Sequence, residues 1–159
     1  MSIRIRDKID ADREWIVSEL TKEWGGVMIE RAREFIDAMG LETIVAEHGG
    51  EPTGFATLLL MEKETEIITI KAFTSGQMVG TAMLQEIADR ARQRGHKCIK
   101  VFTSNDNLDA LRFYQRRGFR IEKIWKDSIT EARKIKPSIP IEGQYGIPCC
   151  DEIELHRTL

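Results

Sequence analysis

The first residues whose types and spacing could do chemistry form the stretch TSGQMVGTAML, residues 74–84. The stretch follows a β-branched run, residues 66–70, and opens an amphipathic segment. Backbone N–H groups at the start of a helix have no intrahelical partner, and the helix dipole adds partial positive charge there. The stretch could therefore bind an anion. It contains neither Gly-x-Gly-x-x-Gly nor Gly-Lys-Ser/Thr, so on its own an anion site and a plain turn are both open.

Two side chains near this stretch could move protons. Tyr114 belongs to the segment Asn107-x-x-Ala110-x-x-Phe113-Tyr114-x-x-x-Gly118-Phe119. Its phenol, with an ordinary pKa near 10, carries its proton at neutral pH and can donate it. Glu66 begins the β-branched run, and a carboxylate in a partly desolvated cleft could have a raised pKa suited to a base. The residues alone also allow Tyr114 as a core aromatic and Glu66 as a solvent-facing strand end.

Periodicity predicts the elements that must position these groups. Residues 66–72 and 98–103 are expected to be strands, with a helix over 80–94 between them. Such a strand–helix–strand unit is typical of a crossover between parallel strands. Residues 107–117 predict a second helix, ended by Gly118. The apolar stripe of the first helix consists of Met83, Leu84, Ile87, Ala88 and Ala91, with Gly95 expected at its C-terminal cap.

The rest of the chain predicts further strands and helices around this unit. Residues 27–39 are ambiguous between a helix and a strand that runs into a helical turn. The other expected elements are strands over 2–6, 42–47, 54–61, 119–125 and 152–156, and helices over 11–24 and 127–136. With no internal repeat or linker, residues 1–159 are expected to form a single domain.

Composition excludes several classes of function. Hydrophobic content of 42%, charged content of 31% and a net charge of −2 give no reason to expect nucleic acid or an anionic membrane as a partner. No apolar stretch approaches the ~20 residues of a spanning helix. Three cysteines with no metal-ligand spacing suit a cytoplasmic protein with reduced thiols and no bound metal. The acids Asp37, Glu47, Asp151 and Glu152 could attract a cationic substrate, and the sequence does not choose among them.

Together, two segments resemble the GNAT superfamily of acyl-CoA-dependent N-acetyltransferases. Gln77-x-x-Gly80-x-Ala82 is similar to that family's pyrophosphate-binding signature, Arg/Gln-x-x-Gly-x-Gly/Ala, and residues 107–119 are similar to its second motif. The likeness is specific over residues 66–119. Met78 stands where many relatives have glycine, and Ala82 replaces the commoner final glycine. Neither change removes a backbone N–H donor, since only proline would.

The resemblance implies a fold and roles for individual residues. The fold would be a single-domain α/β structure: a mixed, mostly antiparallel sheet with a splayed parallel strand pair, flanked by helices. Tyr114 would protonate the departing CoA thiolate, and Glu66 would be the general base. The acetyl-CoA cosubstrate would be held at Ile70, Lys71 and Ala72 along the strand, at Asn107, and at the loop residues Gln77, Met78, Val79, Gly80, Thr81 and Ala82.

The resemblance also implies a reaction, namely acetyl transfer from acetyl-CoA to a primary amine in a ternary complex. The alternative is a non-catalytic acyl-CoA-binding or sensing domain, and a protein that binds nucleotide phosphates is a weaker third reading. The amine acceptor is left open, because it would be selected by residues 11–39 and 127–150, which carry no recognisable signature. A homodimer is also left open, since members of the family often form dimers.

Overall fold

A mixed seven-stranded sheet organises the computed structural model, which describes residues 2–74 and 78–159. The strand order is β1-β4-β5-β6-β7-β9-β8, and every pairing is antiparallel except β6–β7. The predicted mixed, mostly antiparallel sheet with one parallel pair is confirmed. Its strands are β1 (Ile3–Asp7), β4 (Glu42–His48), β5 (Glu51–Leu60), β6 (Glu64–Ala72), β7 (Cys98–Ser104), β8 (Arg120–Trp125) and β9 (Glu152–Thr158).

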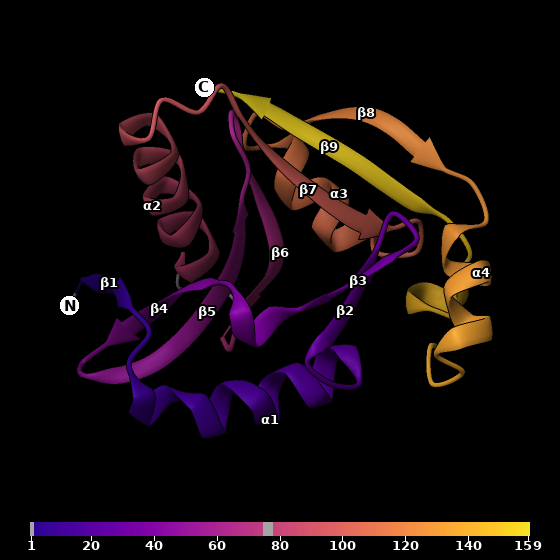
Figure 1. Cartoon of the computed structure of the whole chain (residues 1–159), viewed down its shortest axis with the longest axis horizontal. Coiled ribbons are helices and arrows are strands. Elements are labelled where there is room, and N and C mark those ends of the chain that lie inside the picture. The colour runs from indigo at the N-terminus through magenta and orange to yellow at the C-terminus, as the bar shows by residue number, and fades with distance from the viewer. Residues whose placement is uncertain (1, 75–77) are drawn as a thin grey trace.

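Helices cover the sheet on both faces, and each face has its own apolar core. The helices are α1 (Arg13–Trp24), α2 (Val79–Gln93), α3 (Leu108–Gln115) and α4 (Ser128–Ile135). Alternate residues of β4 and β5 point to opposite faces. Ile44 and Ala56 pack with α2 and α3, whereas Val45 and Phe55 pack with α1. In Figure 1, α1 and α2 lie on different sides of β4, β5 and β6.

The apolar stripe predicted for the helix α2 is confirmed. Met83, Leu84, Ile87, Ala88 and Ala91 are all buried. Gly95 follows the helix with φ of +76°, a left-handed conformation that glycine adopts without a Cβ clash. The helix and the two strands it connects therefore form the expected crossover unit.

The ambiguous segment over 27–39 is a hairpin, so its interpretation as a helix was wrong. It consists of β2 (Met28–Arg31) and β3 (Glu34–Asp37), followed by a 3-10 turn over Ala38–Gly40. Ala32 and Arg33, both with positive φ, make the tight turn between the strands. Ile29, Ala32 and Phe35 have helical spacing, but tertiary packing favours the hairpin because it places Ile29 against α1. The hairpin reaches toward the far ends of β7 and β9, close to α4 (Figure 1).

The parallel pair separates partway along its length, as expected. The β6–β7 ladder pairs residues 64–67 with residues 98–101 and ends at Ile67 and Val101, although both strands continue beyond these residues. On its other side β6 stays paired with β5, with a register shift opposite Thr57 and Leu58. Ile68 is the extra residue of this bulge, and a bulge bends a strand and strengthens its twist. The sheet therefore opens between β6 and β7.

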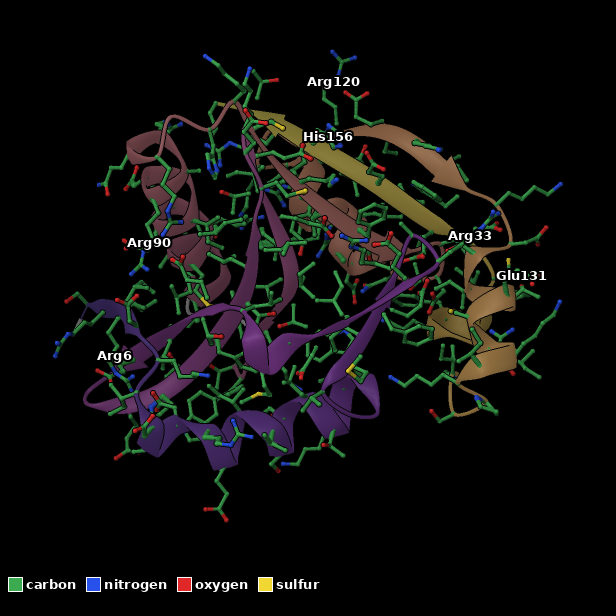
Figure 2. The ribbon with its side chains drawn as sticks, in the orientation of Figure 1. Arg6, Arg33, Arg90, Arg120, Glu131 and His156 are labelled. Carbon is green, nitrogen blue, oxygen red and sulfur yellow. The ribbon has the colours of Figure 1, made fainter. Side chains whose placement is uncertain are left out.

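Charged side chains cover the outside of the molecule, where Arg120 and Glu131 point away from the ribbon (Figure 2). Some of these surface charges form ion pairs: Arg90 of α2 binds Asp7, Glu42 and Glu86. Within residues 2–74 and 78–159, no helix is long and apolar enough to cross a membrane.

Candidate active site

A cavity of about 250 Å³ lies where β6 and β7 separate, and we call it the inner cavity. Residues 67–70 of β6 and 101–104 of β7 form two of its walls, and α3 and the hairpin β2–β3 supply others. A larger outer cavity of about 570 Å³ shares Trp24, Glu30, Ile70 and Asn107 with it. The two cavities therefore form a path from the surface into the opened sheet.

Tyr114 of α3 lines the inner cavity, as a side chain that is only 5% exposed. Its ring packs against Phe119 and Phe113, with centroids 5.2 and 5.4 Å away. Burial raises the pKa of Tyr114 above its ordinary value, so the phenol keeps its proton at neutral pH. Within the described part of the chain, its hydroxyl has no hydrogen-bond partner. The hydroxyl can therefore donate a hydrogen bond to a group that enters the cavity.

Asn107 also lines both cavities and is the N-cap residue of α3. Its side-chain oxygen accepts a hydrogen bond from the N–H of Ala110 at 3.1 Å, which caps the helix. The cap fixes the carboxamide at the cavity wall, so its amino group is available to a ligand there.

The N-terminus of α2 carries most of the expected pyrophosphate loop. Gln77 lies outside the described residues. Met78 has φ of +60° and precedes right-handed residues, and this alternation aims successive N–H groups at one point. The N–H of Ala82 donates to the Met78 carbonyl at 2.9 Å, so the amides ahead of Ala82 are those that helix geometry leaves for an outside partner. The left-handed conformation is one that glycine would adopt at position 78 without a Cβ clash.

Gly80 joins the two sequence motifs in space. A Cβ atom at Gly80 would lie 2.9 Å from Cζ of Phe113, closer than carbon atoms approach in ordinary packing. Arg117 lies over the Phe113 ring, with its guanidinium 3.9 Å from the ring centroid. The same guanidinium donates to Thr81 Oγ1 at 2.9 and 3.0 Å. The start of α2 is therefore held against α3, which carries Tyr114.

The strand residues expected to meet the pantetheine lie past the end of the parallel ladder. Ile70 lines both cavities and Lys71 lines the outer one, whereas Ala72 is exposed. All three still pair with β5, through Ala56, Phe55 and Gly54. Their opposite edge faces the opening, which is the arrangement that an added extended chain requires.

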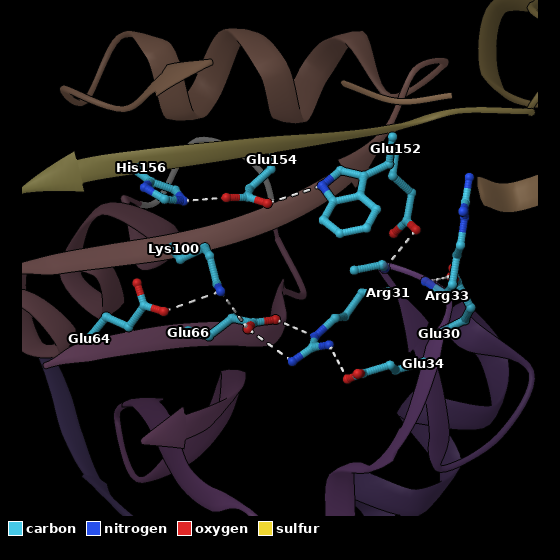
Figure 3. Close-up of polar contacts among 12 residues, drawn as sticks. Glu30, Arg31, Arg33, Glu34, Glu64, Glu66, Lys100, Glu152, Glu154 and His156 are labelled. Carbon is cyan, nitrogen blue, oxygen red and sulfur yellow. Dashed lines mark hydrogen bonds and ion pairs between the residues drawn. The ribbon is translucent and has the colours of Figure 1, made fainter. Parts of the chain in front are cut away.

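Glu66 is fully buried and does not line the inner cavity. Arg31 of β2 donates to both of its oxygens, at 2.6 and 3.1 Å, and Lys100 Nζ lies 3.6 Å away. Figure 3 shows this pair together with Glu34, which also binds Arg31. Burial raises the pKa of Glu66, and the two cations oppose that change. The solvent-facing alternative for Glu66 was wrong, because the hairpin covers it.

Two carboxyls that the sequence did not single out line the inner cavity, Glu30 of β2 and Glu152 of β9. Glu152 is 3% exposed, and its Oε1 accepts hydrogen bonds from the Ala32 N–H, at 2.9 Å, and from the Ser128 hydroxyl. Glu30 lay in the segment whose secondary structure was ambiguous, and Glu152 was one of four acids with no signal to select it. Only the hairpin fold brings them together (Figure 3).

The cysteines give no sign of a thiol nucleophile. Cys149 is buried, and burial beside Asp106 raises its pKa to about 12, so it is not a thiolate at neutral pH. Among the residues that the structure describes, no group of His, Cys, Asp or Glu could hold a metal ion.

Comparison with known sequences gives a family match over most of the chain. The model of the acetyltransferase (GNAT) family matches residues 11–119. The uncharacterized protein YxbD of Bacillus subtilis is 38% identical over 106 residues, which cover 67% of each chain. The uncharacterized protein YdhI of the same organism is 36% identical over 110 residues, 69% of each chain.

Solved structures share the whole fold at low sequence identity. An IAA acetyltransferase from Bacillus cereus aligns with a TM-score of 0.74 and 23% identity, over 99% of this chain and 100% of its own. A GNAT family acetyltransferase from Elizabethkingia anophelis, with acetyl-CoA bound, aligns with a TM-score of 0.71 and 24% identity, over 99% and 98%.

Proposed function

Because the chain belongs to the acetyltransferase (GNAT) family, we propose that it transfers an acetyl group from acetyl-CoA directly to a primary amine in a ternary complex. The observation that carries this proposal is the inner cavity, where the buried Tyr114 phenol faces the opening between β6 and β7. Two solved relatives by fold, from Elizabethkingia anophelis and Bacillus subtilis, have acetyl-CoA or CoA bound.

The donor would bind along the open edge of β6 and at the start of α2. The amides of residues 78–81 suit a pyrophosphate, since they point outward at the positive end of a 15-residue helix. Gln77 and Ala82 complete the expected loop, Ala82 by its small side chain because its amide is already bonded. The pantetheine arm would follow Ile70, Lys71 and Ala72 and meet the Asn107 carboxamide.

Tyr114 would act on the leaving group. Its protonated phenol would donate to the sulfur as the carbon–sulfur bond breaks, in a site that excludes water. Replacing Tyr114 with Phe removes only a hydroxyl that lacks a partner among the described residues, so we expect stability to be retained. The acetylation rate should fall by about 10²-fold or more, with little change in acetyl-CoA affinity. An unchanged rate would refute the assignment.

Glu66 remains a candidate for the base, although direct transfer of a proton from an amine would require Arg31 to move away. Its contacts support a positioning role, in which it fixes Arg31 in the cavity wall. If Glu66 is the base, Glu66→Gln should lose the acidic limb of the pH–rate profile. A variant that keeps that limb is evidence for the positioning role alone.

The experiment that separates this enzyme from a binding domain is release of CoA thiol, with acetyl-CoA and a panel of primary amines. Turnover that depends on an amine supports transfer. Tight binding of acetyl-CoA without turnover for any amine would support the non-catalytic alternative. Stabilisation by ATP in preference to acetyl-CoA would support a nucleotide-binding protein.

We further propose that the chain acts as one domain over residues 1–159, in the cytoplasm, with its cysteines reduced. Cys98, Cys149 and Cys150 are free thiols. A fold whose sheet joins the first strand to the last supports the single domain. Size-exclusion chromatography with light scattering would decide between a monomer and a homodimer.

A further inference from the structure

Glu30 and Glu152 come from distant parts of the chain and line one wall of the inner cavity. None of the Lys, Arg or His side chains that the structure describes forms an ion pair with either of them. The nearest arginine, Arg31, binds Glu66 and Glu34 instead, and Lys136 donates to the backbone carbonyls of Trp24 and Met28. The two carboxyls share a hydrogen bond with each other, and burial disfavours the charged form of both. A cation that enters the cavity from outside would favour their ionisation.

A second observation concerns a proton donor in the same cavity. Tyr114 lines this cavity and is only 5% exposed. Its hydroxyl has no hydrogen-bond partner in the described part of the chain. The cavity therefore presents a proton donor on the α3 side and two carboxyls on the β2 and β9 side. If a thioester and an amine meet in this cavity, the leaving sulfur needs a proton donor and the amine needs a group that takes its proton.

We propose that Glu30 and Glu152 together receive the ammonium group of the acceptor, and that Glu30 takes its proton. The inference rests on the proposed acetyl transfer and names the residues that select a cationic amine. Glu152 is the fixed member, held through Oε1 by the Ala32 N–H and the Ser128 hydroxyl. Glu30 accepts at Oε1 from the Arg33 N–H at 3.1 Å, and its carboxyl shares a hydrogen bond with that of Glu152.

The pKa values of the two carboxyls agree with Glu30 as the group that takes the proton. Burial, and then the neighbouring Glu152 carboxylate, raise the pKa of Glu30 to about 8. Burial raises the pKa of Glu152 as well. The charged groups that face Glu30 are Glu152 from β9, Arg31 from its own strand and Lys136 beyond α4. A base with a pKa near 8 is well matched to the removal of a proton from an alkylammonium ion near neutral pH.

The ammonium ion enters beside the pair, and its charge favours the carboxylate form of Glu30, which takes one proton from nitrogen. The nitrogen lone pair forms a bond to the thioester carbonyl carbon, and the carbon–sulfur bond breaks. Sulfur takes the Tyr114 proton, and the tyrosinate takes the second proton from the new amide nitrogen. The products are an amide, CoA thiol and one proton, which Glu30 returns to water.

The first test uses Glu30→Gln and Glu152→Gln, with Glu131→Gln as a matched control on the exposed side of α4. With an amine found in the acceptor panel, Glu30→Gln should lower kcat/KM for the amine by about 10²-fold and lose the acidic limb, with the KM for acetyl-CoA unchanged. Glu152→Gln should shift that limb to lower pH, because it removes the charge that raises the pKa of Glu30. Glu131→Gln should match the parent.

The second test needs no turnover and uses methylammonium chloride as the probe. Carbon-13 NMR of the glutamate carboxyls should show one group that titrates near pH 8, absent in Glu30→Gln, and methylammonium should lower its pKa. If this shift occurs but the wild type acetylates no amine, the proposed transfer fails and the ammonium site stands. If the wild type turns over while Glu30→Gln keeps the parental rate and limb, or if methylammonium leaves the titration unchanged, the inference is overturned.

Discussion

The contact between Gly80 and Phe113 gives a prediction whose sign is opposite to the usual rule. Replacing a helix glycine with alanine ordinarily stabilises a protein by roughly 0.5–1 kcal/mol, because the unfolded chain loses freedom. At Gly80, the new Cβ would lie 2.9, 3.2 and 3.5 Å from three carbon atoms of the Phe113 ring. Preferred carbon–carbon distances are about 3.5–4.0 Å. The ring must therefore move, although Arg117 covers it and Tyr114 packs beside it.

Overpacking of this kind costs about 1–3 kcal/mol. Subtracting the usual gain leaves a net loss of about 1 kcal/mol in the free energy of unfolding for Gly80→Ala, within a range of about 0–2.5. Because the start of α2 is displaced, the KM for acetyl-CoA should rise roughly tenfold. Urea unfolding followed by circular dichroism measures the first quantity, and steady-state kinetics measures the second.

Two further variants make this prediction refutable. Gly40→Ala is the matched control, because nothing lies within 4 Å of a Cβ at Gly40, so it should be neutral or slightly stabilising. In a double-mutant cycle, Phe113→Leu should relieve the clash, so that the combined loss is smaller than the sum by about 1 kcal/mol. A Gly80→Ala protein that is more stable than its parent, with additive energies in the cycle and an unchanged KM, would refute the reasoning.

Three other predictions concern charge and backbone strain. Arg31→Met leaves the buried Glu66 without its main partner and should cost about 3 kcal/mol at pH 8, but less at pH 5, where the carboxyl is more readily protonated; equal losses in urea unfolding at both pH values would contradict this. Because the folded pKa of Glu30 is raised from 4.5 to about 8, its ionisation penalty grows as the pH rises through that window. The Tm of the parent should fall across the window more than that of Glu30→Gln, and parallel Tm curves would count against the shift. Met78→Gly removes left-handed strain of about 1 kcal/mol but adds comparable chain freedom, so its stability should stay within about 0.5 kcal/mol of the parent, and a large loss in urea unfolding would show that the Met78 side chain contributes.

Local patterns were enough to predict most of the elements. The spacing of Met83, Leu84 and Ile87 defines the buried face of α2 wherever that helix packs, and alternation in the strands sets which residues face the cores. The two motifs around Gly80 and Tyr114 pointed to the donor site, because backbone amides and a phenol need no distant partner to have their chemistry.

Tertiary structure decided the rest, because the deciding contacts join residues far apart in the chain. The segment over 27–39 has helical spacing, but packing of Ile29 against α1 makes it a hairpin. That hairpin buries Glu66 under Arg31 and carries Glu30 to Glu152. Burial and charge at these carboxyls depend on which neighbours surround them, and no local pattern contains that information. The sequence by itself determined the donor site we expect; the fold decided which acids face the acceptor.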